Sequence, residues 1–482
     1  MKKNFDWKEF IASVAVIAIP IALQNLLTTT GSMLDTMMIG TLGEKYVGAV
    51  GLCGQFSSLM GSCYFGFMGG GGLFLAQYWG AQDERGLTRS FGLTMSCMMV
   101  VSLIFTVLAT AFPQLVMRLY TDKVNIQTLG IPYLQIAGFG YPFVVMSMAV
   151  SLLLRSTERV RIPLFASIVS VLTNIFLNYL LIGGHLGAPA LGVRGAAIAT
   201  LSANIVNFLM CVILAKARGF KYLFMFRDFF RWDRGHLSEY FRKCFPILMN
   251  EILIGVSIAI INIVLGRQSE EAIAAIAVFR TMEGLYIGFF VGFSQAASIL
   301  VGKSVGAGRL EEAFERAKRL IYMCAVFIAM IAVIVMALRV PIFRAFGLSG
   351  ESLEIAKGMM SIFAVVIVLR MCNWLHNDTY RTSGDATTGT VLEIAFMYLL
   401  VIPLLLVTAF VWKAPFLLIF AVCYVDEPIR LVLMQIHMYS GRWIDPVTKE
   451  GRAALPEFRA AHGIKRPQGF MFSGRQKDVS EG

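Results

Sequence analysis

The sequence predicts an all-α integral membrane protein with twelve transmembrane helices in two six-helix lobes, related by a parallel pseudo-two-fold repeat. Composition, charge-free stretches and internal repetition lead to this prediction. The chain has 482 residues, of which 57% are hydrophobic and 15% are charged. About 20 consecutive apolar residues span a bilayer as a helix, and several stretches without Asp, Glu, Lys or Arg are at least that long. These stretches are Val47–Gln82, Ser90–Met117, Val124–Leu154, Ile162–Val193 and Gly195–Ala215.

The second half of the chain repeats the first at a constant spacing of 226 residues. Pro20 and Ile21 recur as Pro246 and Ile247, and no gap is needed across the span that matches. Six helices per repeat is an even number, so both repeats enter the membrane from the same side, and their pseudo-axis lies along the membrane normal. Other pairs at this spacing are Gly40 and Gly266, Glu44 and Glu270, Ala49 and Ala275, Gly66-Phe67 and Gly292-Phe293, Gly80-Ala81 and Gly306-Ala307, and Arg155 and Arg381.

The first repeat is expected to form an N-lobe of residues 1–216. Its start, Lys2-Lys3 before an apolar run, mimics a signal peptide. The run from Phe10 to Leu34 is too long for the apolar core of a signal peptide, so we expect it to remain as the first helix. The six predicted helices of this lobe cover residues 10–38, 46–78, 90–112, 127–154, 162–183 and 195–216.

The second repeat is expected to form a C-lobe of residues 244–439. Residues 217–243 are charged and aromatic, which predicts a cytoplasmic linker helix lying at the membrane interface. Residues 440–482 are polar and contain three prolines, and we expect a loosely ordered cytoplasmic tail. The six predicted helices of the C-lobe cover residues 244–266, 272–302, 318–338, 354–379, 390–411 and 415–438.

The net charge of +12 reflects membrane topology, and we expect no nucleic-acid partner. Basic residues crowd into 216–243, 303–319 and the segment after Gly441, which fall on alternate loops. This positive-inside pattern predicts a multi-pass protein of the inner membrane with both termini in the cytoplasm. The eight cysteines form no C-x-x-C pair and the five histidines lack ligand spacing, so no metal site is expected. No nucleotide motif or nucleophile–base pair is present, so we expect neither an enzyme nor a bound cofactor.

Asp35 is the first candidate functional residue. It is the only charged residue between Phe10 and Gly43. A carboxylate at membrane depth costs several kcal/mol unless it is paired or hydrated. Asp35 is therefore expected to bind a proton or a cation such as Na⁺ in a cavity. The alternative is a charge near the helix end that touches water.

Polar side chains on the fifth and sixth predicted helices are further candidates. Asn174 and Asn178 are four residues apart, so they share one helix face. Their amide oxygens can coordinate a hard cation or accept a hydrogen bond from a carboxylic acid. By themselves, they are more typical of hydrogen bonds between helices. Thr200 has the same ambiguity.

The C-lobe contains candidates of its own. Glu251 is the repeat counterpart of Asn25, so an acid stands in one lobe where an amide stands in the other. It is expected either to bind a cationic substrate or proton, or to pair with a base such as Arg280. Arg280 and Glu283 are three residues apart and can neutralise each other. A structural ion cluster is expected at Asp426, Glu427 and Arg430.

Seven short motifs lie at or near the ends of predicted helices or on their polar faces. They are Pro20 with Asp35–Gly40 and Gly43, Gln77–Ala81, Asn174–Asn178, Gly192 with Gly195–Ala197 and Thr200, Gly302–Gly308, Arg381–Asp385 and Ser440–Trp443. Together they resemble the multidrug and toxic compound extrusion (MATE) family of secondary transporters. The resemblance covers almost the whole chain up to residue 443 and is specific in combination.

The resemblance implies a cation site in the N-lobe, formed by Asp35, Asn174, Asn178 and Thr200. The family often carries an aspartate at the position of Asn178, which leaves Asp35 as the main titratable group. Some members also carry an acid midway along the tenth helix, where Asn373 is the nearest match. The cation site of their second lobe is then absent here or moved to Glu251.

The predicted function is a cation-coupled antiporter, driven by H⁺ or Na⁺, that exports drugs or organic cations by alternating access. We expect it to work as a monomer in the lipid bilayer on small-molecule substrates. The alternative is a flippase of lipid-linked oligosaccharides or polysaccharides from the same superfamily. Such flippases usually carry more helices and a cationic cavity, whereas few Arg or Lys lie deep in the predicted helices of this chain.

Overall fold

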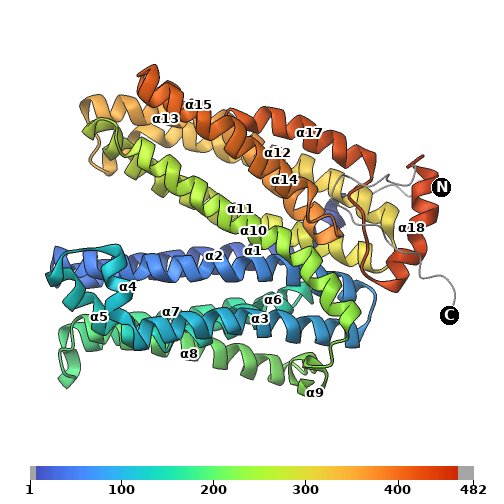
Figure 1. The fold of residues 1–482 in the computed structure, drawn as a ribbon, viewed down its shortest axis with the longest axis horizontal. Helices are drawn as coiled ribbons and strands as arrows, with labels where there is room; N and C mark the ends of the chain where they lie inside the picture. Colours follow the sequence, from blue (N-terminus) through green and yellow to red (C-terminus); the bar gives the residue numbers. More distant parts are fainter. Residues whose placement is uncertain (1–6, 465–482) are drawn as a thin grey trace.

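The computed structural model describes residues 7–464 and contains no β-strand among them (Figure 1). The first half holds α1 (Trp7–Gly40), α2 (Glu44–Gly80), α3 (Glu84–Ala111), α4 (Pro113–Tyr120), α5 (Val124–Gly138), α6 (Tyr141–Ser156), α7 (Arg161–Gly183), η1 (His185–Gly187) and α8 (Val193–Ala217). The second half holds α10 (Arg234–Leu265), α11 (Glu270–Gly306), α12 (Leu310–Ala345), α13 (Gly350–Ser383), α14 (Thr388–Phe396), η3 (Met397–Val401), α15 (Ile402–Leu406), η4 (Val407–Val411), α16 (Phe416–Val422) and α17 (Asp426–Ser440).

The predicted fold class is confirmed. Ten of the helical stretches in the described part are long and apolar enough to cross a membrane, and the bent pair α5 and α6 makes an eleventh passage. α14 runs without interruption through η3 and α15 to the end of η4 at Val411. The twelfth passage, α16 followed by α17, is interrupted at residues 423–425 and carries charged residues in its second part.

The outer faces of the helices are apolar, as a lipid environment requires. On α3 and α12 the side chains that point away from the rest of the protein are large and hydrophobic. The protein is therefore a multi-pass membrane protein. These exposed residues include Val100, Leu103, Ile104 and Val107 on α3, and Val326, Met330, Val333 and Ile334 on α12.

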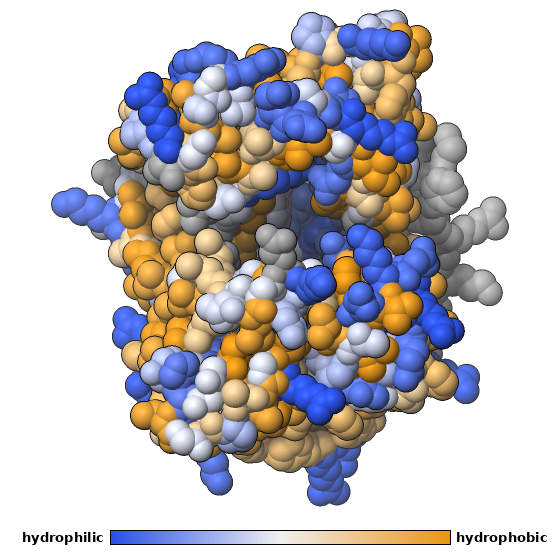
Figure 2. Space-filling model, turned by 90° about the vertical axis from the view of Figure 1, so that its left-hand side faces the viewer, coloured by the Kyte–Doolittle hydropathy of each residue, from blue (hydrophilic) through white to orange (hydrophobic). Residues whose placement is uncertain are grey.

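The two halves form separate lobes that meet at one end of the molecule and diverge at the other (Figure 1). The converging end is the one where the described chain starts and finishes: Trp7 lies beside Arg319 at the start of α12, and α18 (Lys449–Ala461) packs nearby. Figure 2 looks at the diverging end and shows a hollow between the lobes, with hydrophilic residues visible in its depth.

Glycines of the repeat bring the lobes into contact at the converging end. A Cβ on Gly80 of α2 would overlap the carbonyl oxygen of Lys303 on α11. Reciprocally, a Cβ on Gly306 would overlap the carbonyl oxygen of Gln77. Gln77 and Lys303 are repeat counterparts, as are the two glycines, so the contact obeys the two-fold symmetry of the repeat. Small residues permit this close approach of helices.

α1 belongs to both lobes. Phe10, Val14 and Ile17, in its first half, are buried in the same hydrophobic core as the C-lobe helices α11 to α13. Gly292 of α11 lies against the α1 backbone at Ala18. Further along, α1 packs against α7 of the N-lobe. A change in the angle between the lobes therefore acts directly on α1.

The linker differs from the single interfacial helix that the sequence predicts. α10 begins at Arg234, where Asp233 caps it by accepting a 2.6 Å hydrogen bond from the backbone N–H of His236. Residues 234–243 therefore belong to the first helix of the C-lobe. The remainder folds into two short turns, η2 (Tyr222–Phe224) and α9 (Phe226–Phe229), and buries Phe229 edge-on against Phe91.

The expectation of a loosely ordered tail is wrong for residues 440–464, and residues 465–482 lie outside the described part. Thr448 caps α18, and its hydroxyl donates to the carbonyl of Gly306 at 2.7 Å. The N–H of Val447 donates to Oε1 of Gln77 in the N-lobe at 2.8 Å. Phe458 packs against Phe314 of α12. Composition alone missed this helix because its docking surface is supplied by α11 and α12, which are distant in the sequence.

Candidate ion and substrate sites

The N-lobe site is centred on Asp35, near the end of α1 at the diverging side. Nδ2 of Asn178 on α7 donates a 2.6 Å hydrogen bond to Oδ1 of Asp35. The same Nδ2 lies 3.2 Å from Oδ1 of Asn174, one turn away. The structure thus brings together three of the four residues predicted for this site, on the adjoining helices α1 and α7.

Thr200 of α8 completes the surroundings of this site. It lies next to Tyr133 of α5, which is also close to Asp35. Oδ1 of Asn178 is buried and accepts no hydrogen bond within the described chain. A carboxylate with unpaired amide and hydroxyl oxygens nearby suits a proton or a hard cation, because such ions prefer oxygen ligands.

A second polar layer lies deeper in the N-lobe. Nε2 of Gln24 donates to the hydroxyl of Ser167 at 2.8 Å, and the guanidinium of Arg155 donates to Oε1 of Gln24 at 2.6 Å. Nδ2 of the neighbouring Asn25 is buried without a hydrogen-bond partner in the described chain. Apart from Arg155, this layer is neutral.

The C-lobe contains the repeat counterpart of this layer in an acidic form. Nδ2 of Asn250, the counterpart of Gln24, donates to Oε2 of Glu393, the counterpart of Ser167, at 3.1 Å. Arg381, the counterpart of Arg155, lies 3.3 Å from Glu251 and 4.0 Å from Asp378. Equivalent positions thus meet in both lobes, and the C-lobe carries three carboxylates, Glu251, Asp378 and Glu393, where the N-lobe has Asn25, Leu152 and Ser167.

The base that pairs with Glu251 is Arg381. The sequence had suggested Arg280, which instead donates to Glu283 at 2.6 Å and to Oδ1 of Asn262 at 3.0 Å. The predicted pairing of Arg280 with Glu283 is present. Glu251 belongs to the polar layer beside α13, whereas Arg280 faces a cavity that is lined further along α10 by Ile254, Ile258, Ile261 and Leu265 and that reaches Glu393 of the polar layer.

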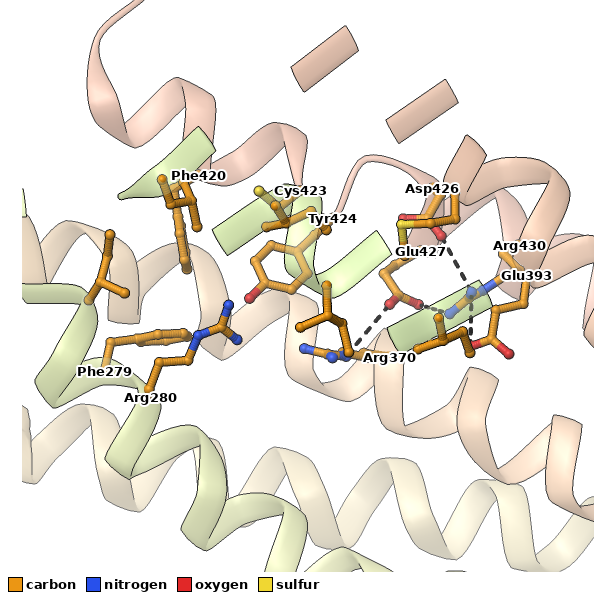
Figure 3. Close-up of a pocket in the computed structure, with 16 residues that line it drawn as sticks. Phe279, Arg280, Arg370, Glu393, Phe420, Cys423, Tyr424, Asp426, Glu427 and Arg430 are labelled. Carbon is orange, nitrogen blue, oxygen red and sulfur yellow. Dashed lines mark hydrogen bonds and ion pairs between the residues drawn. The ribbon is translucent and has the colours of Figure 1, made fainter. Parts of the chain in front are cut away.

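That cavity lies within the C-lobe, and Figure 3 shows the charged side chains along it. Arg370 of α13 donates to Glu283 at 2.6 Å and lies 4.0 Å from Glu427. Arg430 donates to the same Glu427 at 2.9 Å and lies 3.5 Å from Asp426. The ion cluster predicted at Asp426, Glu427 and Arg430 is therefore present, and it extends further than expected.

Asn373 of α13 donates hydrogen bonds to this ion cluster. Its Nδ2 donates to Oε2 of Glu427 at 2.7 Å and to the backbone carbonyl of the same residue at 2.9 Å. Arg370 and Glu393 were not among the residues predicted from the sequence. Both are charges inside predicted apolar helices, so the signal that singled out Asp35 would also have identified them.

Family comparison decides what kind of protein holds these sites. The MatE family matches the chain twice, over residues 20–180 and 246–407. The chain belongs to the MatE family. The two matched segments start 226 residues apart, so this membership includes the internal repeat.

Bacterial MatE relatives are similar over most of their length. A probable multidrug resistance protein, YoeA of Bacillus subtilis, is 26% identical over 79% of this chain and 83% of its own length. The multidrug export protein MepA of Staphylococcus saprophyticus is 24% identical over 85% of this chain and 91% of its own length.

Solved MatE structures share the fold. A crystal structure of a MATE protein in complex with MaL6 superposes with a TM-score of 0.79 at 17% identity, covering 89% of this chain and 96% of that one. A MATE family transporter described as outward-facing superposes with a TM-score of 0.76 at 19% identity, with the same coverage of both chains.

Proposed function

We propose that this protein is a cation-coupled antiporter that exports drugs or organic cations from the cytoplasm. The observation that carries the proposal is the hydrogen bond from Asn178 to Asp35, the acid of α1 near the diverging end of the N-lobe. The names of the bacterial relatives support drug export, and the oxygen-rich surroundings of Asp35 support coupling to H⁺ or Na⁺. The distribution of basic loops supports an inner-membrane location with cytoplasmic termini, and the protein acts as a monomer.

The proposed mechanism links ion binding to the angle between the lobes. With the termini in the cytoplasm, the structure is closed on the cytoplasmic side and open to the outside. Asp35 lies on α1, the helix whose first half packs in the C-lobe core. An ion that binds the two arrangements of the lobes with different affinity shifts the equilibrium between them, and a substrate does so in the same way. Transport then follows when each ligand favours the opposite arrangement.

The flippase alternative is not favoured. Three arginines, Arg280, Arg370 and Arg430, line the C-lobe cavity, which corrects the expectation of few cationic residues there. Each of them is paired with a carboxylate. The cavity is therefore not the cationic chamber that a polyanionic lipid-linked sugar needs.

The decisive experiment measures efflux from proteoliposomes with each gradient imposed separately. Purified protein is reconstituted, a fluorescent organic cation is loaded, and either a pH gradient or a Na⁺ gradient is applied while the other is held at zero. Acceleration by one gradient identifies the coupling ion. Equal rates with both gradients and with none would contradict the proposal.

A further inference from the structure

The chain from Gly441 to Ile464 runs across the end of the molecule where the lobes meet (Figure 1). We call this segment, which includes α18, the strap. It is anchored in the C-lobe both near its start and near its finish. Trp443 and Ile444 are fully buried in the C-lobe core, and Phe458 of α18 belongs to the same core. The strap should therefore move with the C-lobe.

Between these anchors, Val447 of the strap enters the N-lobe. Its side chain is 4% exposed and lies in a small apolar cluster, separate from the C-lobe core. The other members of this cluster come from α2, α3 and the first part of α10, and are Leu73, Phe74, Leu93, Tyr240 and Cys244. The backbone N–H of Val447 donates to Oε1 of the buried Gln77 on α2 at 2.8 Å. Nε2 of Gln77 donates to the carbonyl oxygen of Thr382 in the C-lobe, also at 2.8 Å, so both polar ends of this N-lobe side chain are bonded across the interface.

Two ion pairs join the strap to the first part of α10, the part that packs on α2 and α3. Nζ of the buried Lys243 lies 2.6 Å from Asp445 of the strap and donates to the carbonyl oxygen of Gly384 in the C-lobe at 2.8 Å. The guanidinium of Arg452 in α18 pairs with Glu239 of α10. A buried cation that loses its partner is costly, so these contacts also oppose separation of the lobes at this end.

The internal repeat shows that such a crossing is not built into the fold. The repeat counterpart of Val447 is Lys221, in the linker that follows the N-lobe. Its side chain is 60% exposed, and its Nζ lies 2.7 Å from Glu84 of that same lobe. Phe229 of the linker packs edge-on against Phe91, again in the same lobe. The linker thus docks on the lobe that it follows, whereas the strap also reaches the other lobe.

We propose that the strap is a latch that holds the converging end of the protein closed, and that Val447 must leave the N-lobe before this end can open. Because the anchors fix the strap to the C-lobe, separation of the lobes withdraws Val447 from its apolar cluster and breaks its bond to Gln77. The latch therefore favours the arrangement of the lobes seen here. This inference goes beyond the proposed export function and rests only on its alternating arrangements of the lobes.

Val447→Ala tests the latch, because it removes two carbon atoms from the side chain that is buried in the N-lobe cluster and keeps the backbone. Spin labels are placed at residues 161 and 387, which are exposed repeat counterparts at the converging end. Distances between the labels are measured by pulsed electron paramagnetic resonance in lipid nanodiscs, without ion gradient or substrate. We expect the ratio of the long-distance to the short-distance population to rise about tenfold, as follows from losing the burial of two carbon atoms.

The matched controls separate the latch from a general loss of packing. Val150→Ala makes the same truncation at a fully buried valine of α6, inside the N-lobe core. It should lower the melting temperature and leave the distance distribution unchanged. Arg452→Glu places like charges side by side and should shift the distances in the same direction as Val447→Ala, by about threefold in the ratio. Adding Glu239→Arg restores opposite charges and should return the distribution towards that of the wild type.

Two results would overturn the proposal. The first is an unchanged distance distribution in Val447→Ala, whatever its melting temperature. The second is an equal shift in Val150→Ala, which would show that any loss of packing loosens the lobes. Efflux plays no part in these measurements, so the latch and the coupling of transport to an ion can fail independently of each other.

Discussion

Asn178 donates its amide hydrogen to Asp35 at 2.6 Å, which ties the acid of α1 to α7 of the same lobe. The same Nδ2 also lies 3.2 Å from Oδ1 of Asn174, one turn earlier on α7. Since an amide N–H can donate to an ionised carboxylate and to a neutral carboxyl group alike, this contact holds Asp35 in place in both protonation states.

Asp35→Asn is expected to abolish gradient-driven efflux while the protein still folds, because an amide of the same shape can neither release a proton nor bind a cation by charge. The measurement is dye efflux from proteoliposomes, with the melting temperature in detergent as the control for folding. Efflux at the wild-type rate would show that Asp35 is merely a charge near the helix end.

Asn178→Leu should weaken the response to the coupling ion more than Asn174→Leu, because Asn174 reaches the acid only through Asn178. Combining either substitution with Asp35→Asn should add little, since members of one site are non-additive. Efflux rates of the single and double variants form the test. Fully additive losses would mean that the asparagines only hold helices together.

Glu251→Gln should reduce export of cations more than export of neutral compounds and should flatten the pH dependence of transport. The acid is absent from the N-lobe counterpart, Asn25, so the fold itself does not require it. Its partner Arg381 keeps Asp378 as a second anion at 4.0 Å, which should preserve folding. Equal losses for both substrate types together with a lower melting temperature would indicate a purely structural pair.

Lys303→Glu should shift the lobes away from the present arrangement. Nζ of Lys303 in the C-lobe lies 2.7 Å from Glu158 in the N-lobe, and both side chains are about two-thirds buried. Loss of an ion pair of this kind should destabilise the present arrangement of the lobes by roughly 1 kcal/mol. This corresponds to about a fivefold change in the ratio of the two arrangements. Spin labels at residues 122 and 351, at the diverging end, should report a shorter distance.

The charge-swapped double variant of that pair is the matched control. Lys303→Glu combined with Glu158→Lys restores opposite charges across the same gap and should return the distance distribution towards that of the wild type. A double variant that behaves like Lys303→Glu alone would show that the ion pair does not hold the closed end together.

Asp385→Asn should lower stability at neutral pH by about 1–2 kcal/mol, as expected for hydrogen bonds to a charged group. Burial in the loop after α13 would raise the pKa of Asp385, but hydrogen bonds from His437 and Thr388 outweigh it and hold the pKa below its ordinary value. A carboxylate whose pKa is lowered by folding stabilises the fold at pH values above its ordinary pKa, which is near 4. This stabilisation is lost as the pH falls through the lower pKa of the folded state.

Thermal unfolding in detergent between pH 7 and pH 3 measures this effect. The wild type should lose stability in acid more steeply than Asp385→Asn. Glu354→Gln provides the control, because Glu354 forms only an exposed pair with Lys357. Parallel pH profiles for Asp385→Asn and the wild type would contradict the assignment.

The sequence by itself determined the architecture. Long stretches without charge define membrane helices, because a charge in lipid is costly wherever the rest of the chain lies. The spacing of 226 residues defines two equivalent lobes, and the same reasoning singled out Asp35. The amide face of Asn174 and Asn178 follows from helical periodicity alone. Each of these signals is local or depends only on a constant offset.

The tertiary structure decided which charges meet. Glu251 pairs with Arg381, 130 residues away, rather than with Arg280. Arg370 and Arg430 share Glu427, and α18 docks on α11 and α12 while Val447, just before it, bonds Gln77 of the N-lobe. Such pairings depend on how far each helix is rotated and how deeply it packs against neighbours, which hydropathy leaves undetermined. In an apolar interior every charge needs a partner, but only the packing of distant helices determines which one it finds.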